Sequence, residues 1–134
     1  MNQMKITHVQ PQKIAMPSGN WTPLVVVDHP GKLAFLSGFT SRDEQGNVHG
    51  IGDIRAQTRR VCEMLRNVVQ QAGGQLSDIV RVDVYTVDIT HFSAIHEVRR
   101  EFFPVNPPAS TMVQVSRLVD ERSLIEINAI AVLP

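Results

Sequence analysis

The chain has 134 residues, which is enough for one domain with a single hydrophobic core, and we predict one domain over residues 1–134. Its 13 Lys and Arg residues balance 13 Asp and Glu residues, so the formal net charge is zero. Proteins that bind nucleic acid through phosphate contacts usually carry a basic surplus, so the balance argues against that class. Zero net charge also leaves self-association unopposed.

Cysteine usage and the apolar runs predict a soluble cytoplasmic protein. The single cysteine, Cys62, cannot form an intramolecular disulfide, which fits a reducing compartment. The first residues, MNQMKITHVQPQK, contain no apolar run of the kind found in signal peptides. Uninterrupted apolar stretches such as Leu24–Val27 are far too short to span a membrane.

The N-terminal third of the sequence predicts strands and loops. A short strand near Lys5–Val9 lies within an otherwise irregular, proline-containing start. The runs TPLVVVDH (22–29) and KLAFLSG (32–38) flank the turn residues His29-Pro30-Gly31, so we predict that they form a β-hairpin. The polar stretch TSRDEQGNVHGIG (40–52) follows as a loop.

Two helices follow from the 3.6-residue periodicity. Asp53 can cap a helix that starts at Ile54 and stops at Gly73-Gly74. Thr90 can cap a second helix, HFSAIHEVRREFF (91–103), which Pro104 ends. Apolar or small residues recur every three or four positions in the first helix (Ile54, Thr58, Val61, Leu65, Val68 and Ala72) and in the second (Phe92, Ile95, Val98 and Phe102).

The remaining segments predict strands. In IVRVDVYTVDI (79–89), three valines at 80, 82 and 84 alternate with Arg81, Asp83 and Tyr85, as in a strand with one buried face. Two closing strands, Met112–Leu118 and Leu124–Val132, flank the charged turn VDERS. The order β-β-α-β-α-β-β predicts an α+β fold whose mixed sheet carries two helices on one face. Apolar residues on both sides of the last strand indicate that another subunit half buries the second face.

Four segments together resemble the RidA (YjgF/YER057c) superfamily, also written UK114: DIRAQTRRVCEMLRNVVQQAGG, DIVRVDVYTVDITHFSAIHEV, EFFPVNPPAS and LIEINAIAV. The similarity runs roughly from Gly19 to Val132. It implies a chorismate-mutase-like fold and a homotrimer, in which three sheets form a central barrel with ligand sites between subunits. Archetypal members are enamine/imine deaminases that hydrolyse 2-aminoacrylate-type compounds without a metal or organic cofactor.

The resemblance also implies a set of site residues. Glu126 in IEINA matches the catalytic Glu that orients water, and Trp21 stands where an aromatic Tyr lines the ligand cleft. Ser37 and Gly38 match a strand end that faces the ligand, and His96 replaces an Asn. In PASTM, the family's anchoring Arg, Ser and Cys are replaced by Ser110, Thr111 and Met112.

The missing Arg changes the expected substrate. Loss of a buried, bidentate charged contact costs on the order of 2–5 kcal/mol, so 2-aminoacrylate is not the substrate we predict. Ser110 and Thr111 could instead hydrogen-bond a neutral or smaller ligand group, or simply satisfy local backbone groups. Arg99, which replaces a family Tyr, and Arg42 are candidate replacement cations.

Several interpretations remain open from the sequence. Glu126 could be an outward-facing strand carboxylate, His96 a solvated surface histidine and Cys62 a small core residue. The five histidines share no metal-ligand spacing, so we predict no metal site. We predict a hydrolase of a small imine, enamine or related C–N compound. The alternatives are a non-catalytic small-molecule binding or interaction protein, and a ribonuclease, which the neutral charge disfavours.

Overall fold

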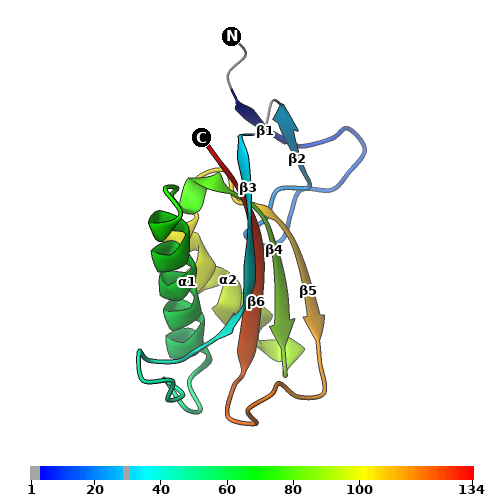
Figure 1. The fold of residues 1–134 in the computed structure, drawn as a ribbon. Helices are drawn as coiled ribbons and strands as arrows, with labels where there is room; N and C mark the ends of the chain where they lie inside the picture. Colours follow the sequence, from blue (N-terminus) through cyan, green and yellow to red (C-terminus); the bar gives the residue numbers. More distant parts are fainter. Residues whose placement is uncertain (1–3, 29–30) are drawn as a thin grey trace.

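A computed structural model describes residues 4–28 and 31–134 of the chain, and it contains two sheets and two long helices (Figure 1). No helix in this described part is long and apolar enough to cross a membrane. The strands are β1 (Lys5–Val9), β2 (Leu24–Asp28), β3 (Lys32–Thr40), β4 (Ile79–Thr86), β5 (Ala109–Gln114) and β6 (Ile125–Leu133). The helices are α1 (Ile54–Gln71) and α2 (Phe92–Phe102), with 3-10 turns η1 (Leu76–Asp78) and η2 (Ile89–His91).

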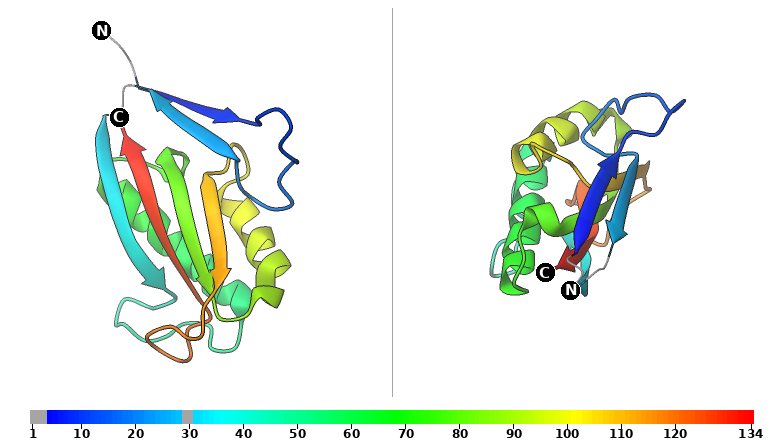
Figure 2. Two further views of the ribbon diagram at one scale, coloured as in Figure 1. Left: turned by 90° about the vertical axis from the view of Figure 1, so that its right-hand side faces the viewer. Right: turned by 90° about the horizontal axis from the view of Figure 1, so that it is seen from above.

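The main sheet has four strands in the order β3-β6-β4-β5. β6 pairs antiparallel with β3 and β4, whereas β4 and β5 are parallel. Both helices cover one face of this sheet and leave the other face open, as Figures 1 and 2 show. The predicted α+β arrangement, with two helices on one face of a mixed sheet, is therefore confirmed.

The predicted hairpin between residues 22–29 and 32–38 is wrong. β2 pairs with β1, with Lys5 opposite Asp28, while β3 pairs with β6. The two segments thus belong to different sheets, and His29 and Pro30 of the predicted turn lie outside the described residues. Turn-forming residues identify a change of direction, but distant segments decide which strands pair.

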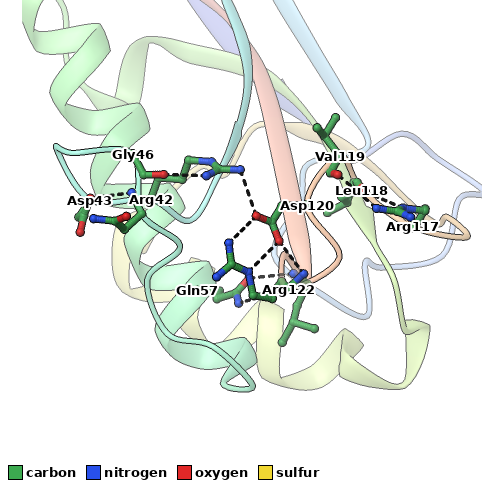
Figure 3. A network of polar contacts seen from close by, with 11 residues as sticks. Arg42, Asp43, Gly46, Gln57, Arg117, Leu118, Val119, Asp120 and Arg122 are labelled. Atoms are coloured by element: carbon green, nitrogen blue, oxygen red, sulfur yellow. Dashed lines mark hydrogen bonds and ion pairs between the residues drawn. The ribbon is translucent and has the colours of Figure 1, made fainter.

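Helix α1 agrees with its predicted boundaries. The Asp53 side chain accepts a hydrogen bond from the Ala56 N–H at 3.0 Å. Gly73, at φ +93°, adopts the left-handed conformation that ends the helix. The buried face includes Gln57, whose amide donates to the Arg122 carbonyl at 3.0 Å and ties α1 to the turn before β6 (Figure 3).

The predicted cap of the second helix is wrong. Asp88, not Thr90, caps the turn that leads into α2, because its carboxylate accepts from the Thr90 N–H at 2.9 Å and from the Thr90 hydroxyl at 2.6 Å. The 3-10 turn η2 therefore starts at Ile89, one residue before the expected cap. On the outer surface, Arg59 pairs with Glu101 at 3.0 Å and links the two helices.

The core lies between the helices and the main sheet. In β4 the inner residues are Ile79, Val82 and Val84, because a bulge shifts the register between Ile79 and Arg81 and leaves Val80 only partly buried. The prediction that Val80, Val82 and Val84 share one buried face is therefore wrong for Val80. The fully buried hydrophobic residues that pack here include Val61, Leu65, Val69, Ile95, Ile125 and Ile127.

Strand β5 begins three residues earlier than predicted, at Ala109, and ends at Gln114. The correction matters because Ser110 and Met112 are then both strand residues, opposite Val82 and Val84 of β4. Since side chains alternate along a strand, Ser110 and Met112 point to the helix side of the sheet, and Thr111 points to the open side.

The open face of the main sheet carries exposed apolar side chains, as the sequence predicts. Phe35 on β3 is 74% exposed, and Leu33 on the same strand and Val113 on β5 are exposed as well. Phe35 lies opposite Ile130, whose neighbours Ala129 and Ala131 point into the core. Cover by another subunit stays a prediction.

Candidate functional site

A cavity of about 180 Å³ lies on the helix side of β5, and it is lined by Trp21, Phe92, His96, Ser110 and Met112. We call it the ring pocket. Four of the eight predicted site residues line it, and they come from the loop after β1, from α2 and from β5. The Thr22 N–H donates to the Pro108 carbonyl at 3.1 Å, which holds the loop beside the start of β5 (Figure 2).

Three aromatic rings form one side of the ring pocket. Ring centroids lie 4.3 Å apart for Phe92 and His96, 5.5 Å for Trp21 and His96, and 6.3 Å for Trp21 and Phe92. Phe92 is not among the predicted site residues. From the sequence it is placed only in the apolar stripe of the second helix. The signal that could have found it is its position four residues before His96, which places both on one helix face.

His96 is 2% exposed, so its interpretation as a solvated surface histidine is wrong. Its Nδ1 accepts a hydrogen bond from the Asn20 N–H at 2.9 Å. Burial, followed by the charges of Arg99 and Arg100, lowers the pKa of His96 to about 4, so the ring is neutral at pH 7. The neutral ring then carries its proton on Nε2, which is buried and has no partner among the described residues.

Arg99 is also buried, at 1% exposure, and lies outside the lining of the ring pocket. One guanidinium nitrogen donates to the Asn20 carbonyl at 2.9 Å. Burial lowers the pKa of Arg99 to about 10, which leaves the group charged at pH 7. Asn20 is thus held through its N–H by His96 and through its carbonyl by Arg99, which fixes the neighbouring Trp21. Sequence reasoning missed Asn20 as a link between the loop and α2.

Arg42, the other candidate replacement cation, does not line the ring pocket either. It donates to the Gly46 carbonyl at 2.7 Å and lies 3.8 Å from the Asp120 carboxylate (Figure 3). Within one copy of the chain, therefore, neither Arg42 nor Arg99 replaces the anchoring Arg at Ser110.

Glu126 lies on the opposite, open face of the sheet, because its neighbours Ile125 and Ile127 are buried against the helices. Gly38 lies beside it, and a Cβ at this position would overlap the Glu126 carboxylate. Ser37 and Gly38 form a bulge in β3, where two residues stand opposite Asn128 alone. Gly38 and Glu126 therefore lie side by side on the open face.

Thr111 lies on this open face as well, within a polar network. Arg81 donates to the Thr111 hydroxyl at 3.0 Å and to the Asp83 carboxylate at 2.8 Å. Asn128 donates to the other Asp83 oxygen at 3.2 Å. Thr111 therefore belongs to a group of residues that faces away from the ring pocket.

The predicted site residues form two groups on opposite faces of one sheet. Trp21, His96, Ser110 and Met112 line the ring pocket, whereas Gly38, Glu126 and Thr111 lie on the open face, with Ser37 exposed in the β3 bulge. One copy of the chain cannot bring both groups to one ligand. A site that uses both requires a second copy.

Two further cavities lie in the described part of the chain. One, of about 230 Å³, shares Trp21 with the ring pocket and is otherwise lined by residues of β1, of the loop between β1 and β2 and of the turn at Asn106-Pro107. The other, of about 370 Å³, lies beside α1, is lined by Asp43, Glu44, Gln45, His49, Arg60 and Glu63, and contains no predicted site residue. Asp43 there already accepts hydrogen bonds from the backbone N–H groups of Gln45 and Asn47. Within residues 4–28 and 31–134, no group of three or more His, Cys, Asp and Glu side chains could hold a metal ion.

Comparison with known proteins places the chain in a family. Residues 12–133 match the family described as Endoribonuclease L-PSP. A Rid-family protein of Yersinia pestis, YyfB, is 26% identical with a TM-score of 0.87, over 96% of this chain and 98% of that chain. The YjgF gene product of E. coli is 31% identical with a TM-score of 0.70, over 76% of this chain and 81% of that chain.

A third structure, a member of the YjgF/YER057c/UK114 family from Mycobacterium tuberculosis, is 30% identical with a TM-score of 0.68, over 84% of this chain and 86% of that chain. The family match spans nearly the whole chain, and the solved structures share its arrangement of two helices on a mixed sheet. The chain therefore belongs to the Endoribonuclease L-PSP family, which is also called the YjgF/RidA family.

Proposed function

We propose that this protein is a cytoplasmic, homotrimeric hydrolase of a small imine, enamine or related C–N compound, in which Glu126 orients the attacking water. The observation that carries the proposal is the position of Glu126. Its carboxylate lies over Gly38, where the backbone has no side chain in the way, on a face that a second copy can approach. Family membership supports the same assignment.

The proposed chemistry balances without a redox step. Glu126 accepts a proton from water as the oxygen attacks the imine carbon, and the C=N bond becomes a C–N single bond. Proton transfer to nitrogen then makes ammonia a leaving group, and the carbinolamine collapses to a carbonyl compound. The net reaction consumes one imine and one water and releases one carbonyl compound and one ammonia.

The homotrimer is proposed because of the two faces of the sheet. The ring pocket and Glu126 lie on opposite faces, so one ligand can contact both only between copies of the chain. The exposed side chains of Phe35 and Leu33 provide apolar area for such an interface. A closed ring of three copies gives every protomer the same contacts.

The second candidate function is a binding protein that keeps the scaffold without the chemistry. Ser110 favours it, because no described charged side chain lines the ring pocket to anchor an acidic substrate. Ribonuclease activity, which the family description names, would need a basic surface, and the net charge of zero argues against one.

Ammonia release tests the proposed function. Two kinds of imine are supplied to the parent protein and to Glu126→Gln: imino acids generated in situ from several amino acids by an amino-acid oxidase, and uncharged aromatic imines generated in situ from benzylamine-type amines by an amine oxidase. We expect the substitution to lower the rate by about 10²-fold or more, as for loss of a general base. The control is Glu121→Gln, which changes an exposed carboxylate in the turn before β6 and should leave the rate unchanged.

Two results would overturn the proposal. Unchanged hydrolysis by Glu126→Gln would remove Glu126 from the mechanism. Failure of the parent protein to hydrolyse any imine above the uncatalysed rate would leave the binding protein as the better description.

A further inference from the structure

We propose that the ring pocket binds an uncharged, planar ring that carries a hydrogen-bond acceptor. The compound hydrolysed would then be a neutral aromatic or heterocyclic C–N compound and not an amino-acid-derived acid. The inference deepens the proposed function and rests on it only in assigning the ring pocket to the substrate.

The size and lining of the ring pocket suit one flat ring. Its volume is about 180 Å³, and an apolar cavity of about 150 Å³ is known to accept benzene. Trp21 and Phe92 meet edge to face, with ring planes at 76°, so their faces and edges are available for aromatic packing. Met112 adds a polarisable apolar wall on the β5 side.

The uncharged lining of the ring pocket disfavours a ligand that carries a carboxylate. Among the described residues, no Lys, Arg, Asp or Glu lines the ring pocket, and His96 is neutral at pH 7. A carboxylate that entered would lose its hydration without gaining a cation within hydrogen-bond distance, which is unfavourable in a confined, largely apolar site. A neutral ring avoids this cost.

The unpartnered Nε2–H of His96 is the reason why the ligand should carry a hydrogen-bond acceptor. The Asn20 N–H occupies Nδ1, so the hydrogen on Nε2 remains available, and that atom is buried without a partner. Gly19 packs against this side of the ring, and a Cβ there would come within 2.8 Å of Nε2, so only a glycine lets the loop approach His96 this closely. A carbonyl oxygen or ring nitrogen of the ligand would satisfy the donor, with the Ser110 hydroxyl as a second polar contact.

Arg99 reinforces this arrangement without entering the ring pocket. Its guanidinium is held by the Asn20 carbonyl, and its charge opposes protonation of His96. The same positive charge favours an electron-rich acceptor as the partner of Nε2. The pair therefore presents one fixed donor to the ligand and no direct cation.

The inference is tested with three monosubstituted benzenes: benzamide, which is neutral with a carbonyl acceptor; benzoate, which has nearly the same shape but is anionic; and toluene, which is smaller and has no acceptor. Trp21 is the chain's only tryptophan and lines the ring pocket, so its fluorescence reports binding there. Because Trp21 also lines the neighbouring cavity of about 230 Å³, the Ser110 and His96 variants below show which cavity the probe occupies. We expect saturable binding of benzamide that is at least about tenfold tighter than that of benzoate or toluene, a factor equivalent to one decade in Kd. Equal or tighter binding of benzoate would overturn the inference.

Substitutions at the ring pocket sharpen the test. Ser110→Arg introduces a guanidinium at the lining, and it should reverse the preference toward benzoate by about tenfold or more. The matched control, Ser93→Arg, places the same charge on the exposed surface of α2 and should keep the parent preference for benzamide. Reversal in both variants, or in neither, would contradict the inference.

His96→Leu provides a second line of evidence after circular dichroism has verified its fold. It should bind benzamide no better than toluene, because the Nε2 donor is gone. Because binding is measured without turnover, the two proposals fail separately. Benzamide binding with no imine hydrolysis would overturn the proposed function alone, and Glu126-dependent hydrolysis with a preference for benzoate would overturn the ligand class alone.

Discussion

Gly38 decides, at the scale of single residues, where the Glu126 carboxylate can lie. The backbone at Gly38 is outside the left-handed region, so an L residue fits its conformation, yet a Cβ there would overlap the carboxylate. The constraint on this position is therefore the space that the Glu126 side chain occupies and not the backbone angle. A methyl group at Gly38 must displace the proposed catalytic group while the strand remains intact.

We expect Gly38→Ala to lower imine hydrolysis by about 10²-fold, because a displacement of roughly 1 Å in a reacting group can cost that much. Steady-state kinetics on the imine substrates measure the loss. In the Glu126→Gln background the same change should add little, since both act through one group. Additive losses would show that Gly38 acts elsewhere.

Because of His96, the free energy of unfolding should decrease at acidic pH. Its pKa is about 4 in the folded protein and 6.5 when unperturbed, so the unfolded chain binds a proton first as the pH falls. The associated stability is present above pH 6.5 and is lost toward pH 4. Each pKa unit corresponds to about 1.4 kcal/mol, and a measurement at pH 4.5 stops above the folded pKa, so we expect a loss of about 2 kcal/mol.

Urea denaturation at pH 7.5 and pH 4.5 measures this loss. The parent protein should lose more stability than His96→Asn, whose amide oxygen can still accept from the Asn20 N–H but does not titrate. Equal losses in the two proteins would assign the acid sensitivity to other groups, such as Asp43 and Asp88, whose pKa values backbone and side-chain hydrogen bonds lower.

At the scale of secondary-structure elements, the start of α1 depends on one side chain. Asp53 accepts from the Ala56 N–H, one of the helix N–H groups that lack an intrahelical partner. The same cap lies beside Gly50, whose carbonyl accepts from the Asp53 N–H at 2.9 Å, so it also orients the loop that enters the helix.

Asp53→Ala should lower the free energy of unfolding by about 1 kcal/mol, the usual cost of losing an N-cap. Asp53→Asn keeps a side-chain oxygen that can accept and should lose clearly less. Urea denaturation at neutral pH compares the three proteins. If the two variants lost the same amount, the carboxylate charge and not the hydrogen bond would be responsible.

Local sequence patterns predicted where helices and strands lie better than they predicted which strands pair and which side chains are buried. The cap at Asp53 and the stop at Gly73 depend on neighbours within a few residues, so the sequence locates α1 closely. The pairing of β3 with β6 joins segments about a hundred residues apart, as with Lys32 opposite Leu133, and no turn signal reveals it. The burial of His96 and Arg99 likewise depends on the distant loop at Asn20, which covers the helix face that the periodicity assigned to solvent.

Most residues that line the ring pocket were named from the sequence, but their arrangement was not. The family resemblance identified Trp21, His96, Ser110 and Met112, and these four line one pocket. It did not separate the two faces of the sheet, although the alternation along IEINA left open an outward-facing Glu126, which is where the structure places it. Nor did it identify Asn20, whose importance comes from two contacts with α2.

At the scale of the whole molecule, the open sheet face provides the test of assembly. Phe35→Asp places a charge at a 74% exposed apolar position on β3, and we expect it to convert the proposed trimer to smaller species. Light scattering coupled to size exclusion should give the parent protein three times the 14.9 kDa of one chain.

The control for Phe35→Asp is Val119→Asp, at a 91% exposed position in the turn between β5 and β6. It should keep the parent mass. A parent protein that runs at the mass of one chain would contradict the trimer directly, and an unchanged mass for Phe35→Asp would remove this face from the interface.

The placement of Glu126 and the ring pocket on opposite sheet faces has a genetic consequence. If each site in the trimer combines the ring pocket of one copy with Glu126 of the next, two inactive variants can complement each other. Random assembly of equal amounts of a pocket-defective and a Glu126-defective chain would restore about one quarter of the sites, since each intact site needs one half from each chain. Alleles damaged on the two faces would then rescue one another, whereas alleles damaged on the same face would not.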